Sequence, residues 1–249
     1  MLDYRGANTD GPHALRAISN EPLSERARDC VLERGGYRVH LADSSGQCKA
    51  EMLVDRMYSW RGYHTEIMSK PQASPNRITL QASYGQHLFG TLTAGLDSEE
   101  GLLAEMLYPE EVSAFRAKGC KLCEISKLAV EPAYGSNEEL AALFHLAYIY
   151  VYIIHRSTDV LIEVNPRHAP FYQRRLGFRR MGEIRQCPRV AAPAVLLHIE
   201  LSYMEAQISR YAGSRDTTDR SLYPYFFSAV QAPLNNQQKL CEERVQLAA

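Results

Sequence analysis

A carboxylate and an ammonium group stand three residues apart in a stretch whose other residues are small, branched or apolar. The stretch covers residues 123–130 and carries Glu124 and Lys127. This composition is typical of an inner strand, where an ionisable side chain needs a partner or a task. Residues three apart on a regular strand point to opposite faces. A β-bulge would bring both charges to one side, and bulges cluster beside active sites. The alternative is an edge strand with two solvated charges.

A second candidate group lies on a predicted helix over residues 47–64. Arg56 stands four residues before Trp60, the only tryptophan of the chain. A guanidinium beside an aromatic wall is suited to a carboxylate ligand. An amphipathic helix whose arginines face solvent is the alternative interpretation.

Polar residues also follow two of the predicted strands. Asn165, Arg167 and His168 come at the end of a predicted inner strand over residues 159–165. Ligands collect at the carboxyl ends of strands in α/β sheets, so we expect these side chains near a binding site. For His168 a helix-capping role is favoured. Asp97 would either hydrogen-bond substrate or cap a turn, and the turn cap is favoured.

The elements that would position these residues are predicted from apolar periodicity and from turn and capping signals. The expected order is a strand at 37–42, the helix at 47–64, a hairpin of strands at 77–83 and 86–95, a helical region at 98–119 broken by Pro109, the strand at 123–130, a helix at 136–156, the strand at 159–165, a short helix at 170–176, and strands at 178–187 and 194–203. The central strand, its capped helix and the next strand form a β-α-β unit. The start of that helix is an anion site suited to a pantetheine or pyrophosphate ligand.

This order predicts one α/β (α+β) domain with a mixed central sheet flanked by helices. Residues 1–35 are expected to form a loose N-terminal leader with a short helix near 23–32. The domain is expected at 36–205, followed by a C-terminal helix and tail at 206–249. The apolar patch at 223–227 in this tail is expected to dock back on the domain.

Composition narrows the functional class. The 249 residues are 45% hydrophobic and carry a net charge of −1, which predicts a globular core and no nucleic-acid partner. The chain starts without an apolar signal, so we expect a cytoplasmic protein. The apolar run at 140–154 has 15 residues. A membrane span needs roughly 20, so we expect a buried core helix and no transmembrane segment.

The cysteines are scattered, and without an export signal they are expected to be reduced, mostly buried thiols. Cys120 and Cys123 have the spacing of a metal or redox pair, but no second Cys or His pair lies nearby. We therefore predict no metal site. The six positions are 30, 48, 120, 123, 187 and 241.

Several sequence runs resemble known enzymes. Residues 165–178, in which Phe-Tyr leads to Leu-Gly-Phe, resemble the late strand-helix-strand motif of the Gcn5-related N-acyltransferase superfamily, with one extra residue. A closer resemblance is to long-chain N-acyl amino acid synthases, the group that includes N-acyl tyrosine synthases and is related to acyl-homoserine-lactone synthases. It covers residues 50–203 and rests on the runs at 57–63, 89–93, 101–103, 108–111, 124–130, 143–145, 165–178 and 189–196.

The resemblance implies a single Gcn5-related N-acyltransferase-like domain in a bacterial, cytoplasmic enzyme. Its reaction would move a long-chain acyl group from an acyl carrier protein thioester to the amine of an amino acid. The implied partners are acyl carrier protein and the amino acid. No tightly bound cofactor is implied, and acyl-phosphopantetheine or acyl-coenzyme A would serve as co-substrate.

The reaction also suggests roles for the candidate residues. An amino-acid amine is protonated near neutral pH, and Glu124 could take that proton directly or through a water. A structural ion pair with Lys127 or Arg56 is the alternative for Glu124. Unpaired backbone N–H groups on a splayed central strand could stabilise the developing oxyanion. Tyr172 resembles the superfamily tyrosine that serves the departing thiolate, with core packing as an equal alternative.

Arg56 and Trp60 resemble an Arg-x-x-x-aromatic pattern of the lactone synthases, which implies a hold on the amino acid's carboxylate. Arg167 could also meet acidic groups or a phosphate of the carrier protein. Two departures from the families stand out. Lys127 replaces the arginine of the lactone synthases. Residues 132–136 (PAYGS) replace the Gln/Arg-x-x-Gly-x-Gly/Ala loop of coenzyme A-dependent relatives, which weakens the case for acetyl-coenzyme A.

Two other functions remain open on sequence grounds. One is a coenzyme A-dependent N-acetyltransferase, and the other is a catalytically silent carrier-binding module that acts in regulation. Thioester turnover would separate the silent module from both enzymes, and donor preference would separate the two enzymes.

Overall fold

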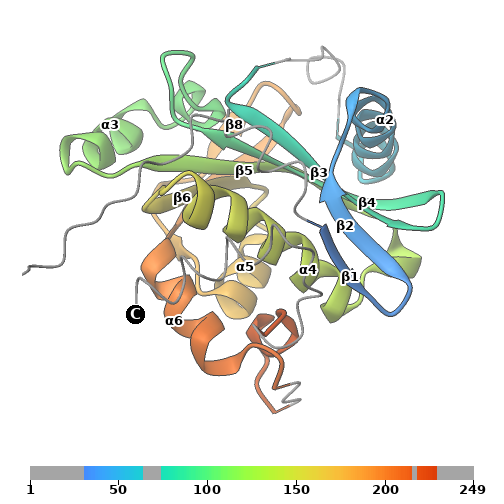
Figure 1. Cartoon of the computed structure of the whole chain (residues 1–249). Helices are drawn as coiled ribbons and strands as arrows, with labels where there is room; N and C mark the ends of the chain where they lie inside the picture. The colour runs from blue at the N-terminus through green and yellow to red at the C-terminus, as the bar shows by residue number, and fades with distance from the viewer. Residues whose placement is uncertain (1–30, 64–73, 215–217, 229–249) are drawn as a thin grey trace, which may run out of the picture.

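Nine strands form a mixed sheet through the computed structural model, which describes residues 31–63, 74–214 and 218–228 (Figure 1). The strand order is β1-β2-β3-β4-β5-β6-β9-β7, with β8 also paired to β9. Only β5 and β6 pair in parallel. The strands are β1 Val31–Arg34, β2 Tyr37–Leu41, β3 Arg77–Tyr84, β4 His87–Leu96, β5 Leu122–Val130, β6 Asp159–Val164, β7 Arg179–Arg180, β8 Arg185–Cys187 and β9 Ala192–Glu200.

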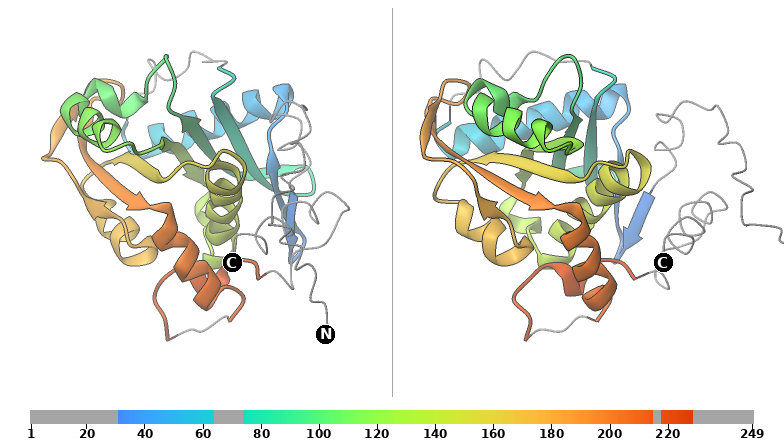
Figure 2. Two further views of the ribbon diagram at one scale, coloured as in Figure 1. Left: turned by 60° about the vertical axis from the view of Figure 1, so that its left-hand side comes forward. Right: turned by 90° about the vertical axis from the view of Figure 1, so that its left-hand side faces the viewer.

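Helices cover both faces of this sheet (Figures 1 and 2). On one face, α2 packs against β3, β4 and β5, while α3 and the short helix η1 lie over β5, β6 and β9. On the other face lie α4, α5 and α6. The helical segments are α2 Ser44–Trp60, η1 Leu103–Met106, α3 Pro109–Ala117, η2 Pro132–Tyr134, α4 Asn137–Tyr148, a π-helical continuation η3 Ile149–Ile154, α5 Ala169–Leu176, α6 Leu201–Tyr211 and η4 Tyr223–Tyr225.

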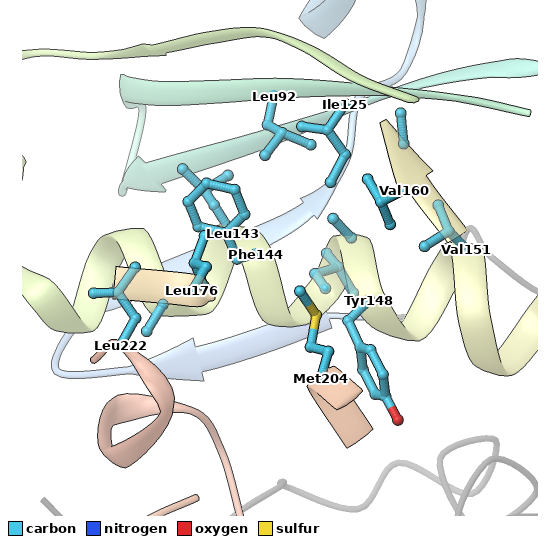
Figure 3. Packing of buried hydrophobic residues seen from close by; sticks show 14 of the residues in the cluster. Leu92, Ile125, Leu143, Phe144, Tyr148, Val151, Val160, Leu176, Met204 and Leu222 are labelled. Atoms are coloured by element: carbon cyan, nitrogen blue, oxygen red, sulfur yellow. The ribbon is translucent and has the colours of Figure 1, made fainter. Parts of the chain in front are cut away.

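The main hydrophobic core lies between the sheet and α4. Ser136 and Glu139 cap the start of α4 reciprocally, as the sequence predicts. From there the helix is buried almost all round, and Leu143 and Phe144 point towards sheet residues such as Leu92 and Ile125 (Figure 3). The interpretation of residues 140–154 as a core helix is therefore confirmed. No helix of the described ranges is both long and apolar enough to cross a membrane.

The central strand contains a β-bulge, one of the two possibilities left open by its sequence. On β4, Thr91 and Thr93 are two residues apart and pair with Ala129 and Ser126, which are three residues apart on β5. The extra residue is accommodated where Lys127 takes a positive φ of 51°. Thr91 and Thr93 are two residues apart on β4 and point to the same face of the sheet. Their partners on β5, Ala129 and Ser126, therefore also point to one face.

The two parallel strands separate soon after they meet. β5 and β6 pair only from Leu122–Asp159 to Glu124–Leu161. Residues 125–130 of β5 and residues 162–164 of β6 continue without pairing to each other, and we call this region the splayed end. Their separation leaves edge-facing backbone groups of β5 available to a ligand.

Three predictions about elements need correction. The strand predicted at 178–187 is two short strands, β7 and β8, interrupted around Gly182. A Cβ at that glycine would lie 2.7 Å from the Tyr108 ring, so the chain bends where it passes a buried aromatic. The last strand ends at Glu200 because α6 begins at Leu201. Val31–Arg34, predicted as leader, forms β1 and pairs with β2, and residues 1–30 lie outside the described residues.

The C-terminal apolar patch docks on the domain as predicted. Tyr223, Phe226 and Phe227 are buried in the main core. The backbone N–H of Phe227 donates to Nδ1 of His145 at 3.0 Å, and the Phe226 ring stacks on that imidazole. Burial lowers the pKa of His145 to about 3, so the ring stays neutral and can accept this bond. The Arg34 guanidinium lies 3.9 Å from the centre of the Phe227 ring, so β1 and the C-terminal patch hold each other.

Candidate active site

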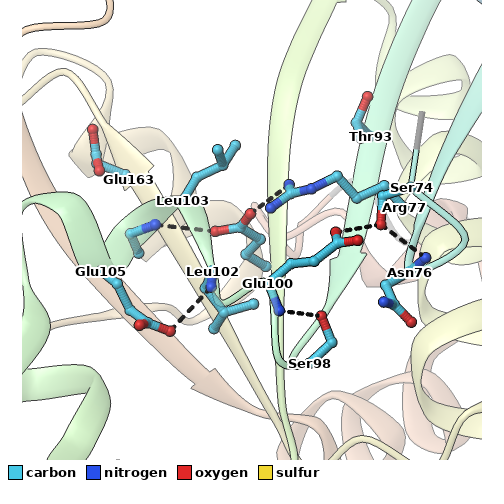
Figure 4. Close-up of polar contacts among 12 residues, drawn as sticks. Ser74, Asn76, Arg77, Thr93, Ser98, Glu100, Leu102, Leu103, Glu105 and Glu163 are labelled. Carbon is cyan, nitrogen blue, oxygen red and sulfur yellow. Dashed lines mark hydrogen bonds and ion pairs between the residues drawn. The ribbon is translucent and has the colours of Figure 1, made fainter. Parts of the chain in front are cut away.

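Glu124 lies on β5 at the last residue that pairs with β6. Its side chain is only 4% exposed. Arg77 donates from Nη1 to Oε1 at 2.7 Å, and the backbone N–H of Ala104 donates to Oε2 at 3.2 Å (Figure 4). Each carboxylate oxygen has two acceptor sites, so one on each oxygen remains for a ligand. The partner of Glu124 is thus Arg77, and not Lys127 or Arg56 as the alternative expected.

A glycine allows this ion pair to form across an intervening strand. Arg77 pairs with Gly95 on β4, and Gly95 pairs with Glu124 on β5. The three residues therefore form one row across the sheet. A Cβ at Gly95 would lie 3.1 Å from Arg77 Nη1 and 3.3 Å from Glu124 Cγ. Without a side chain at this position, the guanidinium can reach over β4 to the carboxylate.

Beyond Glu124, the same face of β5 carries Ser126 and the bulge at Lys127. Oγ of Ser126 is buried and has no hydrogen-bond partner within the described chain. Burial lowers the pKa of Lys127, an effect that Glu51 of α2 opposes and Arg77 reinforces. Since α2 and the Arg77–Glu124 pair occupy the same side of the sheet, the Lys127 ammonium belongs to that side as well. The bulge places a cation, a hydroxyl and the Glu124 carboxylate along one face.

Arg56 and Trp60 do not join this group. The Arg56 side chain is 60% exposed and pairs with Glu131, the residue after β5. Glu131 also accepts from His87 at 2.9 Å. Trp60 is 68% exposed, and its ring lies beside the guanidinium of Arg61. The structure therefore separates Arg56 from Glu124 and gives it an acidic partner of its own.

Asp97 is held by an ion pair. Arg116 of α3 donates to both carboxylate oxygens of Asp97, at 2.7 Å and 2.6 Å. The same guanidinium pairs with Glu105 of η1. The favoured turn-cap role for Asp97 is therefore wrong. Through Arg116, Asp97 ties the end of β4 to α3 and η1, the helices that cover Glu124.

The loop after β6 meets the end of α2. Asn165 Oδ1 accepts from the backbone N–H of Arg167 at 3.1 Å, which fixes the loop. Arg167 then donates to the Tyr63 hydroxyl at 2.9 Å, and its guanidinium lies 5.2 Å from the Tyr63 ring centre. His168 stands at the start of α5, but its side chain makes no capping bond there, so the predicted cap is not formed. Burial, together with Arg167 and Arg61, lowers the pKa of His168.

Tyr172 of α5 packs in the main core against Phe144, Phe171 and Phe178. Burial raises the pKa of its phenol well above the usual range, and Tyr58 contributes to the shift. Burial also raises the pKa of Tyr58 to about 12. Both phenols stay protonated at neutral pH, so each hydroxyl can donate a hydrogen bond. The Tyr172 ring thus packs in the core, and the thiolate role of its hydroxyl stays a prediction.

Sequence reasoning missed the two groups that hold Glu124. Arg77 is the first residue of an ordinary hairpin strand, and nothing in its local sequence marks it. The register of the hairpin could have found it, because Gly95 is the one position that leaves space between Arg77 and Glu124. The Ala104 donor is a backbone group and has no sequence signal.

Comparisons with known proteins bear on the fold and the family of the chain. FeeM, an N-acyl amino acid synthase from uncultured soil microbes, superposes with a TM-score of 0.63 at 25% identity, over 68% of this chain and 93% of that one. A Lactobacillus plantarum protein assigned as an N-acetyltransferase superposes with a TM-score of 0.50 at 13% identity, over 67% of this chain and 99% of that one. The second match bears on the fold alone. No curated protein sequence matches the chain.

The mixed sheet with flanking helices and a splayed parallel strand pair is the fold of the Gcn5-related N-acyltransferases, as expected. The family model described as N-acyl amino acid synthase FeeM matches residues 49–200. That range contains Glu124 with both of its partners, the bulge and the loop after β6. The chain is an acyltransferase and belongs to the FeeM family of N-acyl amino acid synthases.

Proposed function

We propose that this acyltransferase moves a long acyl chain from an acyl carrier protein thioester to the amine of an amino acid, with Glu124 as general base. The observation that carries the proposal is the fixed Glu124 carboxylate at the point where β5 and β6 separate. A carboxylate with both oxygens held, and with an acceptor site left on each, is suited to remove a proton from a bound ammonium.

The chemistry needs one base and one proton donor. Glu124 takes a proton from the substrate ammonium, and the freed nitrogen lone pair attacks the thioester carbonyl carbon. The tetrahedral intermediate collapses by breaking the carbon–sulfur bond, which releases the amide and a thiolate. The nitrogen loses its second proton as the intermediate collapses, and the thiolate takes up that proton directly or through a water, so the products are the amide, a free thiol and a protonated Glu124. Tyr172 is the proposed hydrogen-bond donor to the thiolate, because its raised pKa keeps the phenol protonated.

The splayed end supports binding of the thioester. β5 has no strand partner on the β6 side after Glu124. Its free backbone N–H groups are suited to the carbonyl oxygen, which gains negative charge in the transition state. The Ser126 hydroxyl, buried and unpaired within the described residues, offers a further polar contact to a bound substrate.

A carrier protein is the proposed donor for two reasons. The chain has PAYGS at 132–136 in place of the glycine-rich loop that would bind a coenzyme A pyrophosphate. Instead, the Arg167 guanidinium donates to the Tyr63 hydroxyl and to the backbone carbonyl of Arg61, where the end of α2 contacts the loop after β6. A guanidinium at such a position is suited to the single phosphate of a phosphopantetheine arm and to the acidic surface around it.

This donor choice is directly testable. The purified protein is expected to consume long-chain acyl carrier protein thioesters at least about tenfold faster than acetyl-coenzyme A, measured as thiol release with a mixture of amino acids. Long-chain acyl-coenzyme A is the matched control, because it separates preference for the chain from preference for the carrier. Efficient turnover of acetyl-coenzyme A would instead indicate a coenzyme A-dependent acetyltransferase. A lack of turnover with every donor would favour the silent carrier-binding module.

The amino acid's carboxylate is proposed to bind at Lys127. The bulge places this ammonium on the face that carries Glu124, and its burial favours a ligand of opposite charge. Replacing Lys127 by Met is expected to raise the KM for the amino acid about 10- to 150-fold, which corresponds to loss of about 1.5–3 kcal/mol for a charged hydrogen bond. Turnover at saturating amino acid should change little.

Arg56→Ala is the matched control for that experiment. Its guanidinium is largely exposed and already paired with Glu131, so its removal is expected to change the KM less than about twofold. The Lys127→Arg variant should recover part of the lost affinity. If the KM rose in Arg56→Ala and stayed unchanged in Lys127→Met, the amino acid's carboxylate would instead bind at Arg56, on the outer face of α2.

A further inference from the structure

One peptide group connects two buried ion pairs on the face of the sheet that carries Glu124. The Ala104 N–H donates to Glu124, which also binds Arg77. The carbonyl oxygen of the same peptide group belongs to Leu103, and it accepts from Nη1 of Arg189 at 2.5 Å. Nη2 of Arg189 in turn pairs with Glu163 of β6 at 2.7 Å. Leu103 and Glu163 are labelled in Figure 4.

The four charged side chains of these two ion pairs are shielded from water. The exposed fractions are 4% for Glu124, 11% for Arg77, 10% for Glu163 and 14% for Arg189. Burying two ion pairs costs desolvation energy that apolar side chains of similar volume would avoid. Their presence therefore requires a reason other than stability alone.

The two carboxylates occupy related positions on the splayed strands. Glu124 pairs with Leu161 in the sheet, and Glu163 follows two residues later on β6. It therefore points to the same face as Leu161, which packs under η1 and α3. Each splayed strand thus carries one guanidinium-bound carboxylate on this face, and η1 lies between them.

Arg189 binds η1 at its first residue, Leu103. Residues 103–106 form a single short 3-10 turn, which has little intrinsic stability. The guanidinium fixes the tilt of the Leu103–Ala104 peptide plane by binding its oxygen. It also polarises that peptide group, which strengthens the N–H as a donor at its other end.

We infer that Arg189 is a positioning residue for the proposed base, acting through the Leu103–Ala104 peptide group to orient Oε2 of Glu124, with Glu163 holding the guanidinium in place. This inference deepens the proposed function and rests on the role of Glu124 as base. Burial and the nearby Glu163 carboxylate raise the pKa of the Cys187 thiol, so the thiol stays neutral beside that carboxylate. The β8–β9 hairpin, which carries Arg189, therefore helps to position the proposed base.

The first test is a double-mutant cycle with Glu124→Gln. Arg189→Met should lower kcat about a hundredfold, since a small displacement of a catalytic group has effects of that size. The KM for the amino acid should change little. In the Glu124→Gln background the same substitution should lower kcat less than about threefold, because there is no base left to orient. Arg189→Lys should restore part of the rate.

The second test measures the contact without using turnover. Hydrogen exchange of the Ala104 amide should accelerate at least about tenfold in Arg189→Met. Arg185→Met is the matched control, because Arg185 is on the same hairpin and binds the Leu107 carbonyl and Glu111 without touching the Leu103–Ala104 peptide. Exchange at Ala104 and the kcat should both stay near wild type in that variant.

These measurements distinguish failure of the positioning role of Arg189 from failure of the proposed acyl transfer. Equal loss of kcat from Arg189→Met in the wild-type and Glu124→Gln backgrounds, or unchanged exchange at Ala104, would overturn the positioning role. Wild-type turnover in Glu124→Gln would overturn the base assignment and the inference with it. A wild-type protein that transfers no acyl group would refute the proposed function, and exchange at Ala104 would still decide whether Arg189 holds the peptide group.

Discussion

Replacing Glu124 by Gln is expected to lower the rate of acyl transfer by about 10²–10⁴ at neutral pH. Gln keeps the size of the side chain and can still accept from Arg77 or Ala104, but it cannot take a proton from the substrate ammonium. The loss should shrink as pH rises, because the free amine then forms without help from the protein. Single-turnover rates from neutral to alkaline pH, at saturating donor and amino acid, measure this directly.

Glu131→Gln is a suitable control for this change. Glu131 directly follows β5, pairs with Arg56 and His87, and has no proposed part in proton transfer. Its amide variant should keep the wild-type rate and the wild-type pH profile. Near-normal turnover of Glu124→Gln at neutral pH, with the fold intact, would remove Glu124 from the role of base.

Replacing Arg77 by Met is expected to produce the largest loss of stability. The Glu124 carboxylate would be left buried and without its counterion, which costs about 3–5 kcal/mol in known cases. For a chain of this size that corresponds to a fall in Tm of roughly 6–20 °C. Thermal unfolding followed by circular dichroism measures the shift. Activity should fall as well, since Oε1 of Glu124 loses the group that orients it.

The double variant Arg77→Met, Glu124→Gln is the control for that explanation. With no charge left to compensate, it should regain most of the lost stability while staying inactive. An equally low Tm in the single and double variants would show that Arg77 stabilises the fold through packing of its side chain. A Tm within about 2 °C of wild type for Arg77→Met would contradict the cost of the unpaired carboxylate.

The architecture could be predicted from the sequence because its signals are local. The capping box at Ser136 marks the start of α4, and Glu124 and Lys127 three residues apart in one strand raised the possibility of the β-bulge beside that of an edge strand. The prediction was wrong where an element depends on distant contacts. Residues 178–187 have a strand-like composition, but their course is set by the ring of Tyr108, some seventy residues earlier in the sequence.

The candidate site shows the same limit. Glu124 stands out in the sequence as a charge inside an apolar strand, whereas the residues that hold it do not. Arg77 becomes its partner only through the strand register across Gly95, and Ala104 contributes a backbone group. Arg56 and Trp60 had a convincing spacing, but exposure and the Glu131 partner place them on the outer side of α2. Spacing along a helix predicts neighbours on one surface and does not predict which strand they face.

The docking of the C-terminal patch on β1 has a consequence for biosynthesis. Phe227 binds His145 of α4 and lies under Arg34, so the core joins one of the first described strands to the last described residues. A nascent chain on the ribosome can form the hairpins and α4 early, but it exposes the surface that Phe226 and Phe227 cover until both have left the exit tunnel. The domain therefore completes its fold only after release of that segment, and until then the uncovered apolar surface is a site for chaperone binding.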